Sequence, residues 1–238
     1  MKNAECADRS RRNMILKAPV YGAAFIASAS LPLLAAQAKK NEGKNQEEDV
    51  STNEDLMREH GVLKRVLLAY DEVIRRIRAN RDFPPQTVTD SANIIRKFIE
   101  EYHEKLEENH LFPRFRKAGK LLDLVNVLQT QHEAGRQITD RVLATVQSLK
   151  TKDDRNKLAD DLYAFVRMYS PHEAREDTVL FPALHTIVSP HEYDALGEQF
   201  DKIERETFGG DGFDIYVDKV AAVEKQLGIY DLAQFTPK

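Results

Sequence analysis

The chain has 238 residues, 31% of them charged, with 10 glycines and no tryptophan. This length suits one domain of ordinary size with extensions, and the composition is typical of a water-soluble, helix-rich protein and not of a β-sandwich or barrel. The formal net charge is −4, and no basic block stands out in the body of the chain. We therefore do not expect nucleic acid as a partner.

The first 38 residues have the layout of an export signal. Arg11 and Arg12 precede an apolar stretch rich in small residues, which ends in Ala-Gln-Ala at 36–38. A charged start, an apolar middle and a small-residue cleavage site are the parts of a cleavable signal, and the arginine pair resembles a twin-arginine (Tat) signal. We expect residues 1–38 to direct the chain to the Tat machinery and to be removed, which places the protein in the periplasm or outside the cell. A membrane-anchor helix is the alternative, and the modest hydrophobicity disfavours it, so no stable anchor is expected after cleavage.

Removal of this segment would also remove Cys6, the only cysteine. The exported chain can then hold a metal ion only through imidazole and oxygen ligands. Residues 39–52 are polar and are expected to form a flexible tether.

Four long segments with helical periodicity follow the tether, at roughly 53–80, 89–110, 120–150 and 152–176. Pro113 is predicted to end the second helix, and Pro182 the extension of the fourth. Because the connections between the segments are short, they predict an up-down-up-down four-helix bundle over residues 53–187.

Two further helices are predicted in a C-terminal extension, residues 188–238. The first begins with Ser189 as its cap and Pro190 at the first helical position, and the second follows a glycine-rich break. We expect them to cover one end of the bundle. The fold class is therefore all-α, with no convincing strand pattern.

The second and fourth segments carry a repeat. HEKLEENHLFP at 103–113 returns as HEAREDTVLFP at 172–182, so that His103 and Glu107 recur as His172 and Glu176. Successive residues of a helix are about 100° apart, so positions four apart lie only about 40° apart on its surface. Each histidine and its glutamate therefore project from one side of their helix.

The first and third segments each add one inward histidine, His60 and His132. The chain thus resembles two related helical hairpins, which would bring four imidazoles and two carboxylates to one point in the core. The candidate metal ligands are His60, His103, Glu107, His132, His172 and Glu176.

This donor set suits divalent first-row metals, and iron above all where oxygen chemistry is involved. Two carboxylates can bridge two metals, which gives each metal two histidines and a share of both glutamates and leaves open positions for a small diatomic ligand. Manganese or a mixed pair remains open. Burial of the six groups without a metal would be unfavourable, because unpaired polar groups lose their hydration.

The pattern of His60, His103-x-x-x-Glu107, His132 and His172-x-x-x-Glu176 resembles the hemerythrin-like (HHE cation-binding) family over residues 53–182. The Leu-Phe-Pro after each glutamate is part of the resemblance. It implies a bundle with a non-haem di-iron site of two carboxylate-bridged Fe ions.

The function that the resemblance implies is the binding of O2, NO or peroxide for sensing, storage or stress response. The alternative is a di-iron enzyme with peroxidase- or catalase-like, ferroxidase, NO-reducing or iron-repair activity. A third hypothesis is an iron-storage or structural cation-binding bundle. The sequence leaves open whether the protein is an enzyme.

The sequence departs from the oxygen-carrying hemerythrins in two places. Those proteins carry His-x-x-x-His on the third helix, where this chain has Arg136 four residues after His132, and they carry His-x-x-x-x-Asp on the fourth. A regular helix favours Glu176 over Asp177, which points about 140° away from His172. Asp177, Glu104 and Arg136 stay open as further ligands. The loss of one histidine disfavours reversible oxygen carriage.

Several neighbours of the candidate ligands have open roles. Glu104 and its repeat Glu173 are expected at the surface or behind the ligands. Lys64 and Arg136 either pair with the bridging carboxylates or form ordinary salt bridges. Tyr169 is expected to pack in the core.

Overall fold

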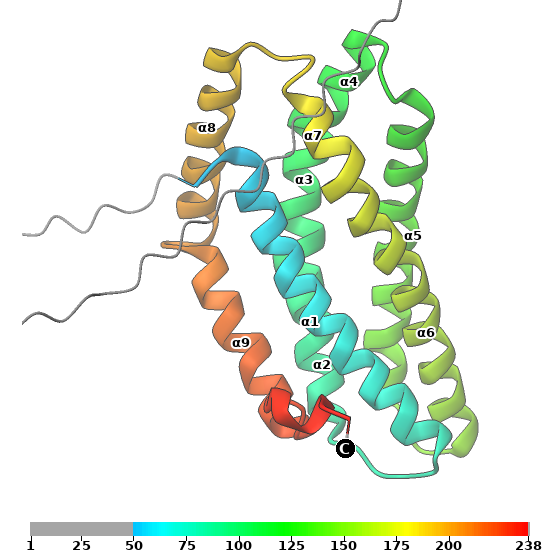
Figure 1. Cartoon of the computed structure of the whole chain (residues 1–238). Coiled ribbons are helices and arrows are strands. Elements are labelled where there is room, and N and C mark those ends of the chain that lie inside the picture. Colours follow the sequence, from blue (N-terminus) through cyan, green and yellow to red (C-terminus); the bar gives the residue numbers. More distant parts are fainter. Residues whose placement is uncertain (1–49, 238) are drawn as a thin grey trace, which may run out of the picture. The chain divides into compact units, whose positions relative to one another are not determined.

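The computed structural model describes residues 50–237, and the predicted export signal and residues 39–49 of the predicted tether lie outside this range. Within the described residues the chain is mostly helical and contains no strand (Figure 1). None of these helices combines the length and the apolar character that a bilayer-spanning segment needs.

Four helical rods form the bundle. The first is α1 (Thr52–Arg78) and the third is α5 (Leu122–Gln147). The second rod joins α2 (Pro85–Ile94), a π-helical segment (Ile95–His103), α3 (Glu104–Leu106), a second π-helical segment (Glu107–Leu111) and α4 (Phe112–Ala118). The fourth joins α6 (Lys152–Arg175), a π-helical segment (Glu176–Leu180) and α7 (Phe181–Leu184).

Each rod packs against its two neighbours, since α1 contacts α2 and α6, and α5 contacts the same two helices (Figure 1). This closed arrangement confirms the four-helix bundle. The helix starts have local causes: Ser51 caps α1 by accepting from the backbone of Glu54, and Thr151 with Asp154 forms a capping box at α6.

The expectation that Pro113 and Pro182 end their helices is wrong. Each proline lies in the first turn after a π-helical segment, and the helices continue to Ala118 and Leu184. Proline normally breaks a helix because it lacks an N–H and its ring clashes with the carbonyl four residues earlier. Here the preceding turn is widened by one residue, as the hydrogen bond from the backbone N–H of Phe112 to the carbonyl of Glu107 shows. The widened turn relieves that clash.

The two predicted C-terminal helices are α8 (Pro190–Phe208) and α9 (Gly212–Leu227), followed by a 3-10 turn (Leu232–Phe235). They do not cover an end of the bundle. Instead α9 runs along α1 and α2, and α8 packs on α1 (Figure 1). Buried apolar residues of α9, such as Val220 and Val223, extend the core to this side, and Arg65 of α1 binds the carboxylate of Glu224 through two hydrogen bonds.

Candidate metal centre

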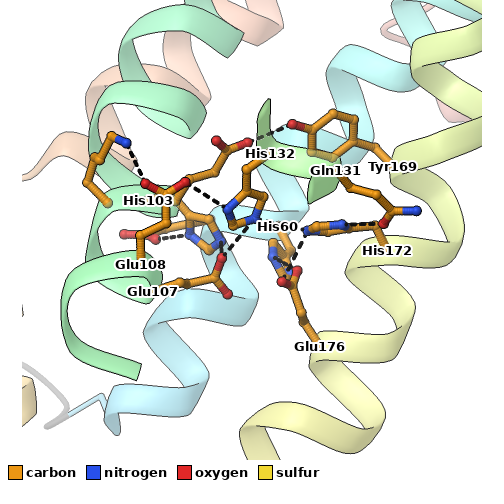
Figure 2. A network of polar contacts seen from close by, with 12 residues as sticks. His60, His103, Glu107, Glu108, Gln131, His132, Tyr169, His172 and Glu176 are labelled. Carbon is orange, nitrogen blue, oxygen red and sulfur yellow. Dashed lines mark hydrogen bonds and ion pairs between the residues drawn. The ribbon is translucent and has the colours of Figure 1, made fainter. Parts of the chain in front are cut away.

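Six side chains from the four rods converge on one place in the core (Figure 2). They are 0–4% exposed to solvent. His60 comes from α1, His132 from α5 and His172 from α6, whereas the other three lie at the boundaries of π-helical segments. These are the six residues that the repeat predicts: His60, His103, Glu107, His132, His172 and Glu176.

The six residues form two clusters whose candidate ligand atoms lie within 4.8 Å of one another. His60, His103 and Glu107 make one cluster, and His132, His172 and Glu176 make the other. We call the space beside His60 and His103 the first position, and the space beside His132 and His172 the second position.

Each carboxylate lies between the two positions. The oxygens of Glu176 are 3.4 Å from His60 Nε2 and 3.1 Å from His172 Nε2. One oxygen of Glu107 is 3.9 Å from His103 Nε2 and 3.4 Å from His132 Nε2. Glu107 and Glu176 therefore each contact one imidazole of either position, which is the arrangement that two bridging carboxylates require.

The outer nitrogen of every ring has an oxygen acceptor, so each Nε2 faces the centre. The four Nδ1–oxygen pairs are His60 with Asp177 at 2.7 Å, His103 with Glu59 at 2.5 Å, His132 with Glu108 at 3.1 Å and His172 with Gln131 at 2.8 Å. Such contacts fix the ring orientation and the tautomer that metal-binding histidines need.

Sequence reasoning left the position of Asp177 open and did not single out Glu59, Glu108 or Gln131. The repeat held the signal, since Glu59 and Gln131 each immediately precede the lone histidine of their hairpin, and Glu108 and Asp177 each follow the repeated glutamate.

Five buried polar atoms at the centre make no hydrogen bond of good geometry within the protein: both oxygens of Glu107, both oxygens of Glu176 and Nε2 of His103. The two carboxylates lie only at ion-pair distance, 3.1–3.9 Å, from the neighbouring imidazoles. A buried polar group without a partner is destabilising by about 1–3 kcal/mol. A cation at either position would give these atoms a partner. The donor set, imidazole nitrogens and carboxylate oxygens, therefore fits a metal ion.

Without a metal ion, the close packing of buried ionisable groups at the centre shifts the pKa values of several of them. Burial, together with the neighbouring charge of Glu176, raises the pKa of Glu107 well above its usual range. Burial opposes ionisation of Glu176 too, but His172 and His60 outweigh it and hold its pKa low. Burial depresses the pKa of His103, whereas Asp177 and Glu176 raise that of His60 to about 10 despite burial. The centre thus holds protons that a bound cation would displace.

Burial also raises the pKa of Glu59, to about 8. A cation on Nε2 of His103 would make Nδ1 the hydrogen-bond donor, and its charge would favour the ionised carboxylate of Glu59.

The repeated Leu-Phe-Pro covers the centre with apolar rings. Phe112 stacks on His132 with ring centroids 5.5 Å apart, and Phe181 stacks on His60 at 5.4 Å. Both phenylalanines are fully buried. Each phenylalanine of the repeat therefore packs against the lone histidine of the opposite hairpin and shields that histidine from water.

Arg136 does not point at the centre. It binds Glu104 at 2.7 Å and also contacts Glu108. Glu104, Glu108 and His132 form a third group with metal-ligand spacing, but the guanidinium neutralises it. Glu104 also accepts a 2.6 Å hydrogen bond from the hydroxyl of Tyr169.

Gly135 makes room for Tyr169, because a Cβ at this position would lie 2.1 Å from the tyrosine hydroxyl. Lys64 on α1 likewise pairs with Glu173 on α6, at 2.7 Å. Lys64 and Arg136 are thus salt-bridge partners of the repeated Glu173 and Glu104 and not of the bridging pair. Both glutamates are buried, so of the two positions expected for them, at the surface or behind the ligands, the structure shows the second.

Residues 51–184 match the model of the hemerythrin HHE cation-binding domain, and residues 124–225 give a second, overlapping match. The chain belongs to the hemerythrin HHE family. It is also 47% identical, over its whole length and 94% of theirs, to uncharacterized proteins of Mycobacterium bovis and Mycobacterium tuberculosis. No solved structure matches the chain.

Proposed function

We propose that this hemerythrin-family chain is a non-haem di-iron protein that binds O2, NO or peroxide in sensing, storage or a stress response. One observation carries the proposal: two buried carboxylates that make no hydrogen bond of good geometry lie between two pairs of imidazoles whose Nε2 atoms face them. Iron bound there would supply reversible redox chemistry and affinity for small oxygen- or nitrogen-centred ligands.

His60 and His103 would hold one ion and His132 and His172 the other, with Glu107 and Glu176 shared. Each ion would then have four protein donors, fewer than the six that first-row ions commonly accept, so positions stay open for a ligand. Because Arg136 is engaged by Glu104 and Glu108, it adds no donor.

The burial of the centre limits what it can bind. The six candidate ligands are 0–4% exposed, and Phe112 and Phe181 cover two of the rings. A bulky substrate cannot reach the carboxylates without the helices separating, whereas a diatomic molecule or peroxide can diffuse through packed side chains. This favours a small ligand.

The first test is the metal content of the protein purified without oxygen, followed by absorption spectra on exposure to air. We expect two irons per chain and oxo-bridged ferric bands, both lost in Glu107→Ala and in Glu176→Ala. Glu101→Ala is the matched control, since Glu101 lies on the same rod as Glu107, is exposed and, among the described residues, forms an ion pair only with Lys97. Iron that is absent, or that is indifferent to the first two substitutions, would refute the proposal.

The enzymatic alternative is supported by one feature. Tyr169 packs 5.2 Å from the ring of His172 and donates to Glu104, which Arg136 joins to the partly exposed edge of the bundle. This places an oxidisable phenol beside a ligand of the second position, as a di-iron enzyme could use in turnover. Peroxide turnover by the iron-loaded protein that falls in Tyr169→Phe, at unchanged iron content, would favour the enzyme; binding of NO or O2 without turnover would favour the binder.

We also propose export by the Tat route, on the basis of Arg11, Arg12 and the stretch that follows them. The test is the location of the protein after cell fractionation. Replacement of Arg11 and Arg12 by lysine should retain it in the cytoplasm. Unchanged export of that variant would refute the Tat assignment.

A further inference from the structure

The two metal positions have unequal surroundings, although the two hairpins repeat one another. At the first position both outer acceptors are carboxyl groups, those of Asp177 on His60 and Glu59 on His103. At the second position His132 has a carboxylate acceptor, Glu108. His172 has a neutral carboxamide instead, that of Gln131, the repeat counterpart of Glu59 (Figure 2).

The cations of the protein increase this difference. Glu108 forms ion pairs with both Arg136 and Lys105, which neutralise its charge. Among residues 50–237 no lysine or arginine forms an ion pair with Glu59 or Asp177. Lys64, the counterpart of Arg136, is held by Glu173. Within residues 50–237, a lysine or arginine is therefore ion-paired to an outer acceptor at the second position only.

We propose that the two positions are inequivalent, and that the first position, at His60 and His103, binds a divalent cation more tightly and fills first. Two carboxyl acceptors that no lysine or arginine pairs with make the imidazoles of the first position stronger donors once a cation on Nε2 has displaced the protons held there. Glu59 acts as a positioning residue, since it reaches the metal only through His103. The inference rests on the proposed metal function.

The expected difference in affinity between the two positions follows from what the hydrogen-bond acceptors of metal-binding histidines contribute to metal binding. Loss of such a partner typically weakens metal binding by 10–100-fold. The second position has the neutral Gln131 where the first has Glu59, and its other acceptor, Glu108, is neutralised by ion pairs. The two stepwise affinities should therefore differ by about tenfold or more.

The test is calorimetric titration of the metal-free full chain with cobalt(II), which reports binding without oxygen chemistry. The wild type should bind two ions in two resolved steps. Glu59→Gln gives each position one carboxamide acceptor and should weaken the tight step by about 10–100-fold, with the weak step unchanged. Gln131→Glu should strengthen the weak step, a gain that damage to the fold could not produce.

Two controls separate the possible outcomes. The exposed Glu101→Gln should leave both steps unchanged, and the double variant Glu59→Gln/Gln131→Glu should restore two unequal steps. Equal steps in the wild type, or a Glu59→Gln variant that weakens both steps alike, would overturn the inference while the metal function stands. A wild type that binds no cobalt would instead overturn the proposed function and the inference with it.

Discussion

Replacement of Glu107 by leucine should stabilise the protein without metal while it removes metal binding. Both carboxylate oxygens of Glu107 are fully buried and make no hydrogen bond. A buried group without a partner is destabilising by about 1–3 kcal/mol, and leucine is close to glutamate in volume. We therefore expect the metal-free Glu107→Leu variant to be about 1–3 kcal/mol more stable than the metal-free wild type.

The assay is urea unfolding, followed by circular dichroism, with and without metal. A ligand present at 100 times its dissociation constant stabilises a protein by about 2.7 kcal/mol, so two bound ions should stabilise the wild type by more than the variant gains and reverse the order of the two proteins. Leu106→Ala, one residue away, is the sensitivity control, because loss of a buried leucine destabilises by about 2–5 kcal/mol. A metal-free Glu107→Leu variant less stable than the wild type would show that these oxygens are satisfied without a cation, which would remove the main support for the metal site.

Three further predictions concern the surroundings of the centre. Gly135→Ala should destabilise the protein by about 1–3 kcal/mol in urea unfolding, because its Cβ would meet the Tyr169 hydroxyl, and Tyr169→Phe in the same chain should recover part of that loss. Burial opposes ionisation of Glu108, but hydrogen bonds from His132, Lys105 and Arg136 lower its pKa from 4.5 to about 2. A depressed folded-state pKa contributes stability above the unfolded value, so this contribution should be lost as the pH falls from about 4.5 to 2 in acid titrations of the wild type, and Glu108→Gln should not show that loss. Ser51→Ala should destabilise by about 0.5–2 kcal/mol, because α1 loses its cap; an unchanged midpoint in urea would mean that the start of α1 does not depend on this hydrogen bond.

The sequence predicted the helices and the six converging residues for local reasons. Apolar periodicity and caps such as Ser189 act within one or two turns, so the starts of the helices can be predicted without knowledge of distant parts of the chain. The spacing of His103 to Glu107, and of His172 to Glu176, fixes each pair on one side of a helix whatever surrounds it. The internal repeat then brought the two pairs together by symmetry.

The tertiary structure decided which groups stand behind the six residues. Whether Arg136 would meet a bridging carboxylate or Glu104, and whether Asp177 would face the metal position or the outer side of His60, depended on how the four rods are rotated against one another. The helices continue past Pro113 and Pro182 because the preceding turns are widened, and a proline in the sequence does not by itself predict such a turn. The local sequence pattern determines which face of a helix a side chain occupies. The groups that this face contacts are determined by long-range packing, which depends on the whole chain.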